Sequence, residues 1–204
     1  MANVSAPFGF SQTSGTGSAP TYENFELPNG GIDYNTAAIY QNDPVIRVSS
    51  SDGTITQAAT AGAVTLAGVF LSCKYLSTSI KRTVWSNYWP GSDVTSANQS
   101  SISAWIVNDP NAQFLVQSDA TGATQAQMGS NVNLNIGTGT AANGLSGAFI
   151  TPATTAAVTA TLPFRMNSLV LFPPGGPGTQ AGAYNTVIVA FNNCETRQLT
   201  SVVA

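Results

Sequence analysis

The side chains that could perform catalysis are few in this sequence, and the commonest one is missing. The chain contains no histidine, which removes the general base of Ser-His-Asp and Cys-His nucleophiles and the commonest metal ligand. Ser72 and Ser77 lie near Lys74 in the sequence, so a Ser-Lys pair is formally available. Because this spacing is ordinary for a strand, we predict no catalytic residue.

The carboxylates stand where turns are expected. Asp43 and Asp109 precede prolines, Asp52 precedes Gly53, and Asp119 opens an Asp-Ala-Thr-Gly turn. A turn aspartate accepts hydrogen bonds from nearby backbone N–H groups, so these residues need no role in the paired-carboxylate hydrolysis of glycosidases. Cysteines and acids do not cluster at the spacing of metal ligands. We therefore predict neither a metal site nor a cofactor.

Charge is scarce along the whole chain. Charged residues make up 7% of the 204 residues and the net charge is −3, whereas an average soluble domain is about 25% charged. Only Lys81 and Arg82 are adjacent cations, so no basic stripe is present to bind nucleic acid. No apolar run reaches the length of a membrane span. Uncharged polar surfaces contact neighbours without desolvating ions, which favours an assembly subunit over a secreted β protein.

The two cysteines, Cys73 and Cys194, lie far apart in the sequence. The N-terminus lacks the basic and apolar regions of a signal peptide. We therefore expect synthesis in a reducing cytoplasm, where both thiols stay free.

Four aromatic residues stand close together in the middle of the sequence: Trp85, Tyr88, Trp89 and Trp105. Aromatic side chains concentrate in cores and subunit interfaces, and we favour this packing role. The alternative is a carbohydrate-stacking platform, in which Trp85 and Trp89 lie against sugar rings.

The elements that would position these side chains are strands. Turn residues divide the chain into about ten short apolar segments, which is typical of a sandwich, jelly roll or barrel. Residues 63–76 are the strongest candidate for a central strand, with Gly68 marking a bulge or a close backbone approach. Residues 102–110 and 113–117 flank an Asn-Asp-Pro turn and form an expected hairpin. In residues 131–139 apolar residues alternate with asparagines, as in a half-buried strand. We predict an all-β, jelly-roll-like or β-sandwich domain over residues 34–204.

Residues 1–33 have a different composition. Gly, Ser, Thr and Pro dominate there, with isolated aromatics at Phe8, Phe10, Tyr22 and Phe25. Such a segment cannot form a core alone, so we expect an extended N-terminal arm. Exposed phenylalanines are unfavourable in water, so we expect the four aromatics to dock on another surface. A disordered tail is the alternative.

Several phrases, in this order, resemble those of the decoration (cement) proteins of tailed phages. They are PFGF, YQNDPVIRV, GVFLSCKYL, SNYWPGS, WIVNDPNAQFLVQ and YNTVIVAFNN. The resemblance spans residues 7–193, and its weight lies in the order of the phrases, because each alone is a strand plus a turn.

The resemblance implies a structural virion protein without enzymatic activity. Such a subunit is made in the host cytoplasm and lies on the outer capsid surface. It binds the major capsid protein and itself, as a homotrimer or alternatively a homodimer, and stabilises the head. Its partners include neither nucleic acid nor membrane. In this reading Phe8, Phe10, Tyr22 and Phe25 contact the capsid. The alternative function is a carbohydrate-binding surface or tail-fibre module of a phage.

Overall fold

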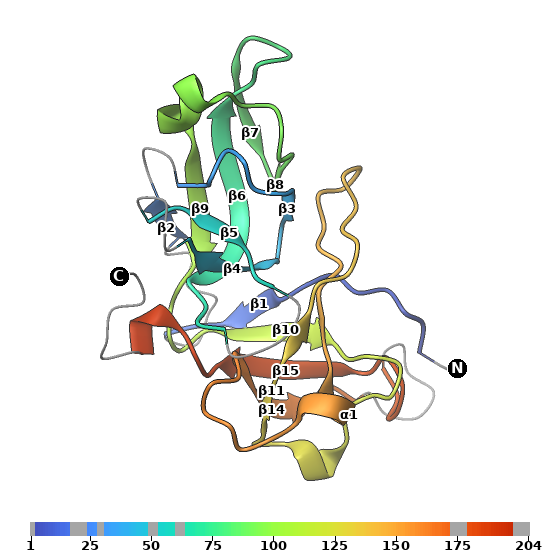
Figure 1. Ribbon diagram of the computed structural model, residues 1–204. Coiled ribbons are helices and arrows are strands. Elements are labelled where there is room, and N and C mark those ends of the chain that lie inside the picture. The colour runs from blue at the N-terminus through green and yellow to red at the C-terminus, as the bar shows by residue number, and fades with distance from the viewer. Residues whose placement is uncertain are drawn as a thin grey trace.

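The computed structural model describes residues 3–16, 24–27, 31–48, 53–59, 64–171 and 179–197. These residues form an all-β, sandwich-like structure of short antiparallel strands (Figure 1), which confirms the expected fold class. Helical structure in this part of the chain is confined to single turns and short 3-10 segments. They are η1 (Ser96–Ser101), η2 (Gln125–Gln127), α1 (Pro152–Thr155) and η3 (Glu195–Arg197).

A five-stranded antiparallel sheet forms the lower half of the molecule in Figure 1, with the strand order β1-β10-β15-β14-β11. The strands are β1 (Ser11–Ser14), β10 (Gln113–Gln117), β15 (Thr186–Phe191), β14 (Phe164–Leu169) and β11 (Asn131–Val132). The central strand β15 reads TVIVAF, and β-branched residues of this kind suit a buried pleated surface.

A second antiparallel sheet, of six strands, stands above the first in Figure 1, with the order β2-β9-β6-β4-β5 and β7 paired to β6. The strands are β2 (Asn24–Leu27), β9 (Ser103–Val107), β6 (Gly68–Leu76), β4 (Pro44–Arg47), β5 (Ile55–Gln57) and β7 (Thr83–Ser86). β6 is central, as the sequence predicts for residues 63–76. A Cβ atom on Gly68 would lie 2.4 Å from the Val107 carbonyl oxygen, which confirms the expected close backbone approach.

Two short strand pairs complete the described structure. β3 (Ile39–Tyr40) pairs with β8 (Tyr88–Trp89), and β12 (Leu134–Asn135) pairs with β13 (Phe149–Ile150). The loop that leads from β12 to β13 rises from the lower half toward β3 (Figure 1).

One expected strand pairing and one expected strand are wrong. β9 and β10 do not form a hairpin, because they belong to different sheets and the Asn-Asp-Pro segment carries the chain from one sheet to the other. The alternating stretch 131–139 is not one strand either. It breaks at Asn133, which is buried and separates β11 from β12. The apolar periodicity of a segment indicates which of its residues are buried, but it does not indicate which strand pairs with that segment.

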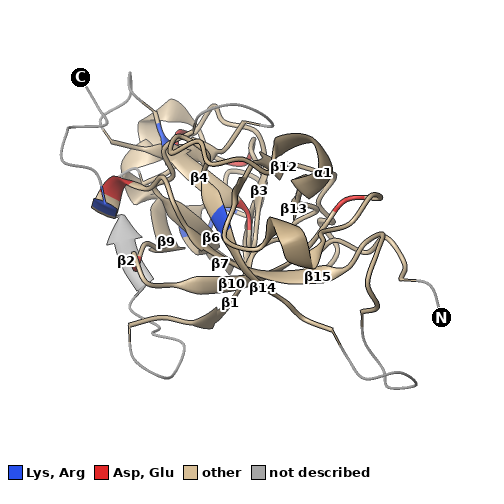
Figure 2. Ribbon diagram, turned by 90° about the horizontal axis from the view of Figure 1, so that it is seen from below, with Lys and Arg blue, Asp and Glu red and all other residues tan. Residues whose placement is uncertain are grey.

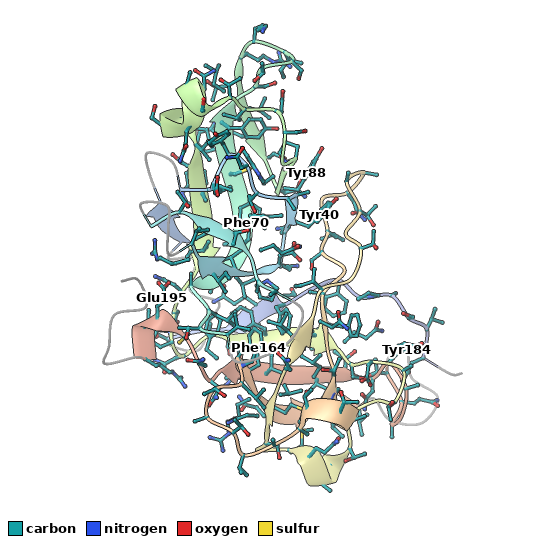
Figure 3. All side chains as sticks on the ribbon, in the orientation of Figure 1. Tyr40, Phe70, Tyr88, Phe164, Tyr184 and Glu195 are labelled. Carbon is teal, nitrogen blue, oxygen red and sulfur yellow. The ribbon has the colours of Figure 1, made fainter. Side chains whose placement is uncertain are left out.

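Each sheet has its own group of buried apolar side chains. The lower core contains Phe10, Phe114, Phe164 and Phe191, and the upper core contains Phe70 and Trp89. In Figure 3 Phe164 and Phe70 mark the two cores. The rings of Phe114, Phe164 and Phe191 pack edge-on or stacked with centroids 4.9–6.2 Å apart, which is the range of favourable aromatic pairs.

Asp43 lies between the two halves with 1% of its surface exposed. Its carboxylate accepts hydrogen bonds from the Tyr40 backbone N–H at 2.8 Å, from Gln57 Nε2 at 2.7 Å and from the Ser146 hydroxyl. Ser146 belongs to the loop between β12 and β13, so Asp43 fastens that loop to the six-stranded sheet. Burial raises the pKa of Asp43, and the three hydrogen bonds oppose this rise without cancelling it.

The described part of segment 1–33 is extended, but it lies along the sheets rather than apart from them. β1 pairs with β10 and β2 pairs with β9. Upstream of β1, the Asn3 side-chain nitrogen donates to the carbonyl oxygens of Gln180 at 2.9 Å and Ala183 at 2.8 Å. The backbone donors and acceptors of an isolated strand must find partners, and here the two sheets provide them.

Candidate functional site

The structure corrects the expectation that Phe10 contacts a capsid. The Phe10 ring is fully buried and stacks on Phe164 with centroids 4.2 Å apart and an interplanar angle of 12°. Phe8 is half-buried. Gly9 between them has φ +75°, and a Cβ atom there would lie 2.6 Å from the Asn42 carbonyl oxygen, so glycine is required for this approach.

Tyr22 and the side chain of Phe25 lie outside the described residues.

The four aromatics near the middle of the sequence do not form one cluster. Trp89 is fully buried and packs edge-on against Tyr75, with ring centroids 5.3 Å apart. Tyr88 stacks on Tyr40, with centroids 5.8 Å apart, and Figure 3 shows the two rings together beside the β12–β13 loop. Trp89 therefore serves the core, as the packing interpretation expects, and is not available to stack on a sugar.

Trp85 and Trp105 lie on the outer surface of the six-stranded sheet. Their rings stack with centroids 5.2 Å apart, and Trp85 is 68% exposed. Lys74 Nζ lies 5.4 Å from the Trp85 ring centroid, within the range of a cation–π contact. We call Lys74, Trp85 and Trp105 the tryptophan face. It is an exposed aromatic surface with one cation, made by three neighbouring strands.

The loop between β6 and β7, residues 77–82, forms the tip of the six-stranded sheet, and we call it the distal loop (Figure 1). It presents Ile80, which is 51% exposed, together with the exposed side chains of Lys81 and Arg82. Lys81 has φ +56°, a left-handed conformation that costs a non-glycine residue of order 1 kcal/mol.

Asp93 holds the distal loop in this conformation. Its carboxylate accepts from the Ser77 hydroxyl at 2.5 Å and from the Ser79 backbone N–H at 2.9 Å, while its carbonyl oxygen accepts from the Thr78 N–H at 2.8 Å. Partial desolvation raises the pKa of Asp93, but the hydrogen bonds from Ser77 and Ser79 outweigh it, so the pKa is lowered. The loop is therefore fixed while its apolar and cationic side chains stay exposed.

A polar groove of about 400 Å³ lies where the two halves meet, and we call it the amide groove. Its lining residues are Ser11, Gln12, Gln41, Asn42, Leu71, Ser72 and Asn87. The register of β6 against β9 shifts between Phe70 and Ser72, and a bulge of this kind re-aims side chains. None of the lining residues carries a charge.

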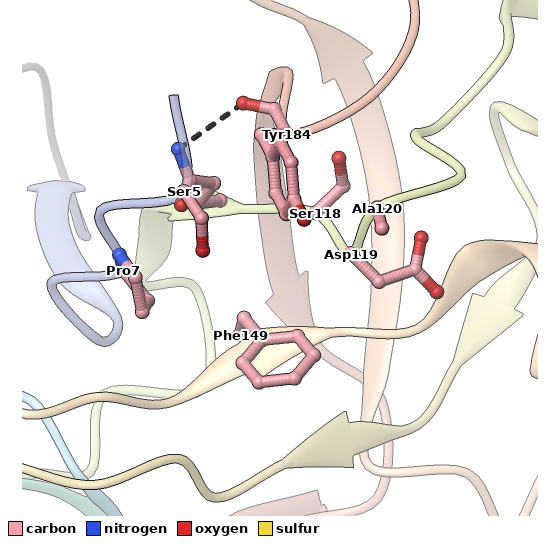
Figure 4. Close-up of a pocket in the computed structure, with 8 residues that line it drawn as sticks. Ser5, Pro7, Ser118, Asp119, Ala120, Phe149 and Tyr184 are labelled. Atoms are coloured by element: carbon pink, nitrogen blue, oxygen red, sulfur yellow. Dashed lines mark hydrogen bonds between the residues drawn. The ribbon is translucent and has the colours of Figure 1, made fainter. Parts of the chain in front are cut away.

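A smaller pocket of about 300 Å³ lies beside the N-terminal segment (Figure 4), and we call it the N-terminal pocket. Phe149 and Tyr184 form much of its wall, and Pro7 closes one side. Gln117 also lines the pocket; it is buried, accepts from the Ala6 N–H at 2.9 Å and donates to the Tyr184 carbonyl oxygen at 3.2 Å. These hydrogen bonds hold the N-terminal segment in place.

The carboxylates expected in turns behave as the sequence predicts at two of the described positions. Asp109 Oδ1 accepts from the Asn111 N–H at 2.9 Å, and Asp119 Oδ1 accepts from the Thr121 N–H at 3.0 Å. Cys73 and Cys194 are both free and buried, as expected, and they belong to different cores. Burial raises the pKa of the Cys73 thiol to about 12.

Figure 2 shows that charged residues are sparse over the ribbon. Among the described residues one ion pair is present, between Arg47 Nε and Glu195 Oε2 at 3.0 Å. Within the same residues, His, Cys, Asp and Glu side chains do not gather in threes that could hold a metal ion.

Sequence reasoning identified Trp85 and Trp105 but missed the distal loop and the amide groove. The adjacent cations Lys81 and Arg82 were a visible signal for the loop. No local pattern pointed to the groove, because its residues come from four separate stretches of the chain that the fold brings together.

No helix among the described residues is both long enough and apolar enough to cross a membrane. Comparisons with protein-family models, with curated proteins and with solved structures each return no match. What the chain does must therefore be inferred from its own surfaces.

Proposed function

We propose that this chain is a capsid decoration subunit of a tailed phage. It binds the outer surface of the major capsid protein lattice as a homotrimer, with a homodimer as the alternative, and stabilises the head. The order of its sequence phrases, which resembles that of decoration proteins, supports this function. So does its scarcity of charge, because weakly charged surfaces can be buried against neighbours at a small desolvation cost.

The distal loop is the observation that carries the proposal. The loop exposes Ile80 beside two cations, and the left-handed Lys81 adds strain. Asp93 nevertheless fixes this arrangement through Ser77, Thr78 and Ser79. A rigid loop binds with little loss of conformational entropy, so the loop is suited to dock on a partner surface.

The side chains of the loop indicate the chemistry of that partner surface. Ile80 requires an apolar depression, and Lys81 and Arg82 require carboxylates around it. The distal loop replaces the N-terminal phenylalanines as the proposed capsid contact, because Phe10 lies in the core of the subunit.

Binding to heads of the parent phage assembled without this protein tests the proposal. We expect the wild-type chain to co-sediment with these heads, and we expect Ile80→Asp and the double variant Lys81→Glu/Arg82→Glu each to weaken binding at least tenfold. Val158→Asp is the matched control, because Val158 is 96% exposed and lies outside the six-stranded sheet. Absence of wild-type binding would refute capsid decoration, and equal binding by all variants would refute the role of the loop.

The oligomeric state is tested separately by size-exclusion chromatography with light scattering. A mass of three times, or alternatively two times, 20.9 kDa is expected. A monomer at every concentration would contradict the proposed self-association.

A further inference from the structure

We propose that the amide groove and the adjoining tryptophan face together bind a neutral saccharide. This inference does not rest on capsid decoration, because the site shares no residue with the distal loop. The sequence suggested a sugar-stacking pair made of Trp85 and Trp89. The proposed site is instead one that the fold assembles from distant residues.

The lining of the groove selects for an uncharged, hydroxyl-rich ligand. Asparagine and glutamine side chains each offer donors and acceptors, and serine hydroxyls do both. An anion would find no cation among the residues that line the groove, and in the adjoining tryptophan face Lys74 lies over the Trp85 ring. An apolar ligand would leave the amides without hydrogen-bond partners, at a cost of about 1–3 kcal/mol for each group that is buried. Sugar hydroxyls match both requirements.

Several polar atoms of the groove are available to a ligand. Within the described residues, the hydroxyls of Ser11 and Ser72 make no hydrogen bond, and the side-chain nitrogen of Gln41 donates none. The Gln41 side-chain oxygen accepts from Asn87 Nδ2 at 3.4 Å, so the side-chain nitrogen of Gln41 remains available to donate to a ligand.

Other contacts hold the lining side chains in place before any ligand arrives. Asn87 Nδ2 donates to the Asn143 carbonyl oxygen at 2.9 Å, and Asn42 Nδ2 donates to the Phe8 carbonyl oxygen at 3.2 Å. Asn42 itself has φ +72°, a left-handed conformation that asparagine tolerates better than most residues. Preorganised amides of this kind lose little entropy on binding.

The tryptophan face adjoins the groove through the register of β6 and β9. Ser72, at the groove wall, is the direct partner of Trp105 across the two strands, so both side chains lie on the same face of the sheet. Trp85 stacks on Trp105 and remains 68% exposed. An exposed indole ring offers a flat apolar surface to the C–H face of a pyranose, while the groove amides receive the hydroxyls of the neighbouring sugar.

Tryptophan fluorescence and isothermal titration calorimetry test the site with the full chain. The probes are neutral hexasaccharides of glucose, mannose, galactose and N-acetylglucosamine, with a heparin hexasaccharide as the charged comparison. We expect at least one neutral hexasaccharide to bind saturably, with Kd below about 1 mM, and to change the fluorescence. Heparin is expected to bind at least tenfold more weakly.

Two variants and a control decide where binding occurs. Gln41→Ala and Trp105→Ala are expected to weaken binding at least tenfold, while Gln125→Ala, which removes an exposed glutamine remote from the groove, leaves it unchanged. Because Trp105→Ala also removes a ring contact, Ser72→Glu provides a second test, which places a carboxylate at the groove wall and keeps both tryptophans. Thermal unfolding confirms that each variant is folded.

Three outcomes would overturn the proposal. They are failure of every neutral hexasaccharide to bind below about 1 mM, binding that is unaffected by Gln41→Ala and Ser72→Glu, and preference for heparin. The last outcome would assign the surface to an anionic ligand held by Lys74.

Discussion

Replacing Phe10 with alanine tests whether the N-terminal segment is a docking arm or a part of the subunit's own core. Phe10 is fully buried and lies 4.2 Å from Phe164, centroid to centroid. Truncating a buried phenylalanine costs about 3–5 kcal/mol, because the transfer free energy of the ring is lost and a cavity remains. For a chain of this length about 2–4 °C of Tm is lost per kcal/mol, so we expect the Tm to fall by about 6–20 °C.

Phe8→Ala is the matched control for this experiment. Phe8 lies two residues away in the same segment but is half-buried and does not belong to either buried core. Its truncation is expected to cost less than about 2 kcal/mol. Differential scanning calorimetry and urea unfolding of both variants give the two free energies directly.

The comparison also has a result that would refute the reasoning. If Phe10→Ala lowered the Tm by less than about 2 °C, the segment before β1 would not be part of the lower core. The same conclusion would follow if Phe8→Ala were the more destabilising of the two. Such a result would again favour the expectation that the N-terminal aromatic residues contact another molecule.

Three further outcomes follow from single buried sites. Asp43→Asn should destabilise the chain by about 1–3 kcal/mol in urea unfolding, because the amide oxygen can replace only the carboxylate oxygen that accepts from the Tyr40 N–H and Gln57, and the Ser146 hydroxyl then loses its acceptor. Because burial raises the folded-state pKa of Asp43 above its ordinary value of 3.8, the wild type gains stability as the pH falls toward that value. Its advantage over Asp43→Asn should therefore be larger at pH 4 than at pH 7, and an advantage that shrinks would contradict the raised pKa. The Cys73 thiol, with its pKa raised to about 12, should react with a disulfide reagent at pH 8 only after unfolding; fast labelling of the native chain would refute its burial. Gly68→Ala should cost about 1–3 kcal/mol, because the new Cβ atom would press on the Val107 carbonyl oxygen, and a melting curve equal to that of the wild type would show that the two strands can separate.

The sequence was sufficient to predict the all-β class and the central strand. Frequent turn residues and the long apolar stretch 63–76 are local signals, and β6 occupies residues 68–76 of this stretch at the centre of its sheet. It was not sufficient for strand pairing. The two sides of the Asn108–Pro110 turn look like a hairpin, yet they enter different sheets, because pairing depends on which distant strands compete for each edge.

The aromatic residues show the same limit. Trp85 and Trp89 are four positions apart, but one is 68% exposed and the other is fully buried. The chain leaves β7, which pairs with β6, after Ser86 and enters β8, which pairs with β3 instead. That change of partner turns Trp89 into the upper core while Trp85 stays outside. Composition alone gives no sign of it, and the amide groove is hidden from sequence for the same reason.

Two identical Asn-Asp-Pro segments further show why a perturbed pKa carries no argument for a reactive group in this chain. Asp109 makes the expected turn contact with Asn111, whereas Asp43 is enclosed and has its pKa raised. Strong pKa shifts mark active sites only when the group also faces a space that a substrate can enter. Asp43 lines neither the amide groove nor the N-terminal pocket, and its carboxylate accepts three hydrogen bonds within the protein. Its raised pKa follows from its burial at the junction of the two halves, where it fastens the β12–β13 loop. The surfaces for which we propose binding are formed instead by uncharged amides, exposed aromatics and a rigid cationic loop.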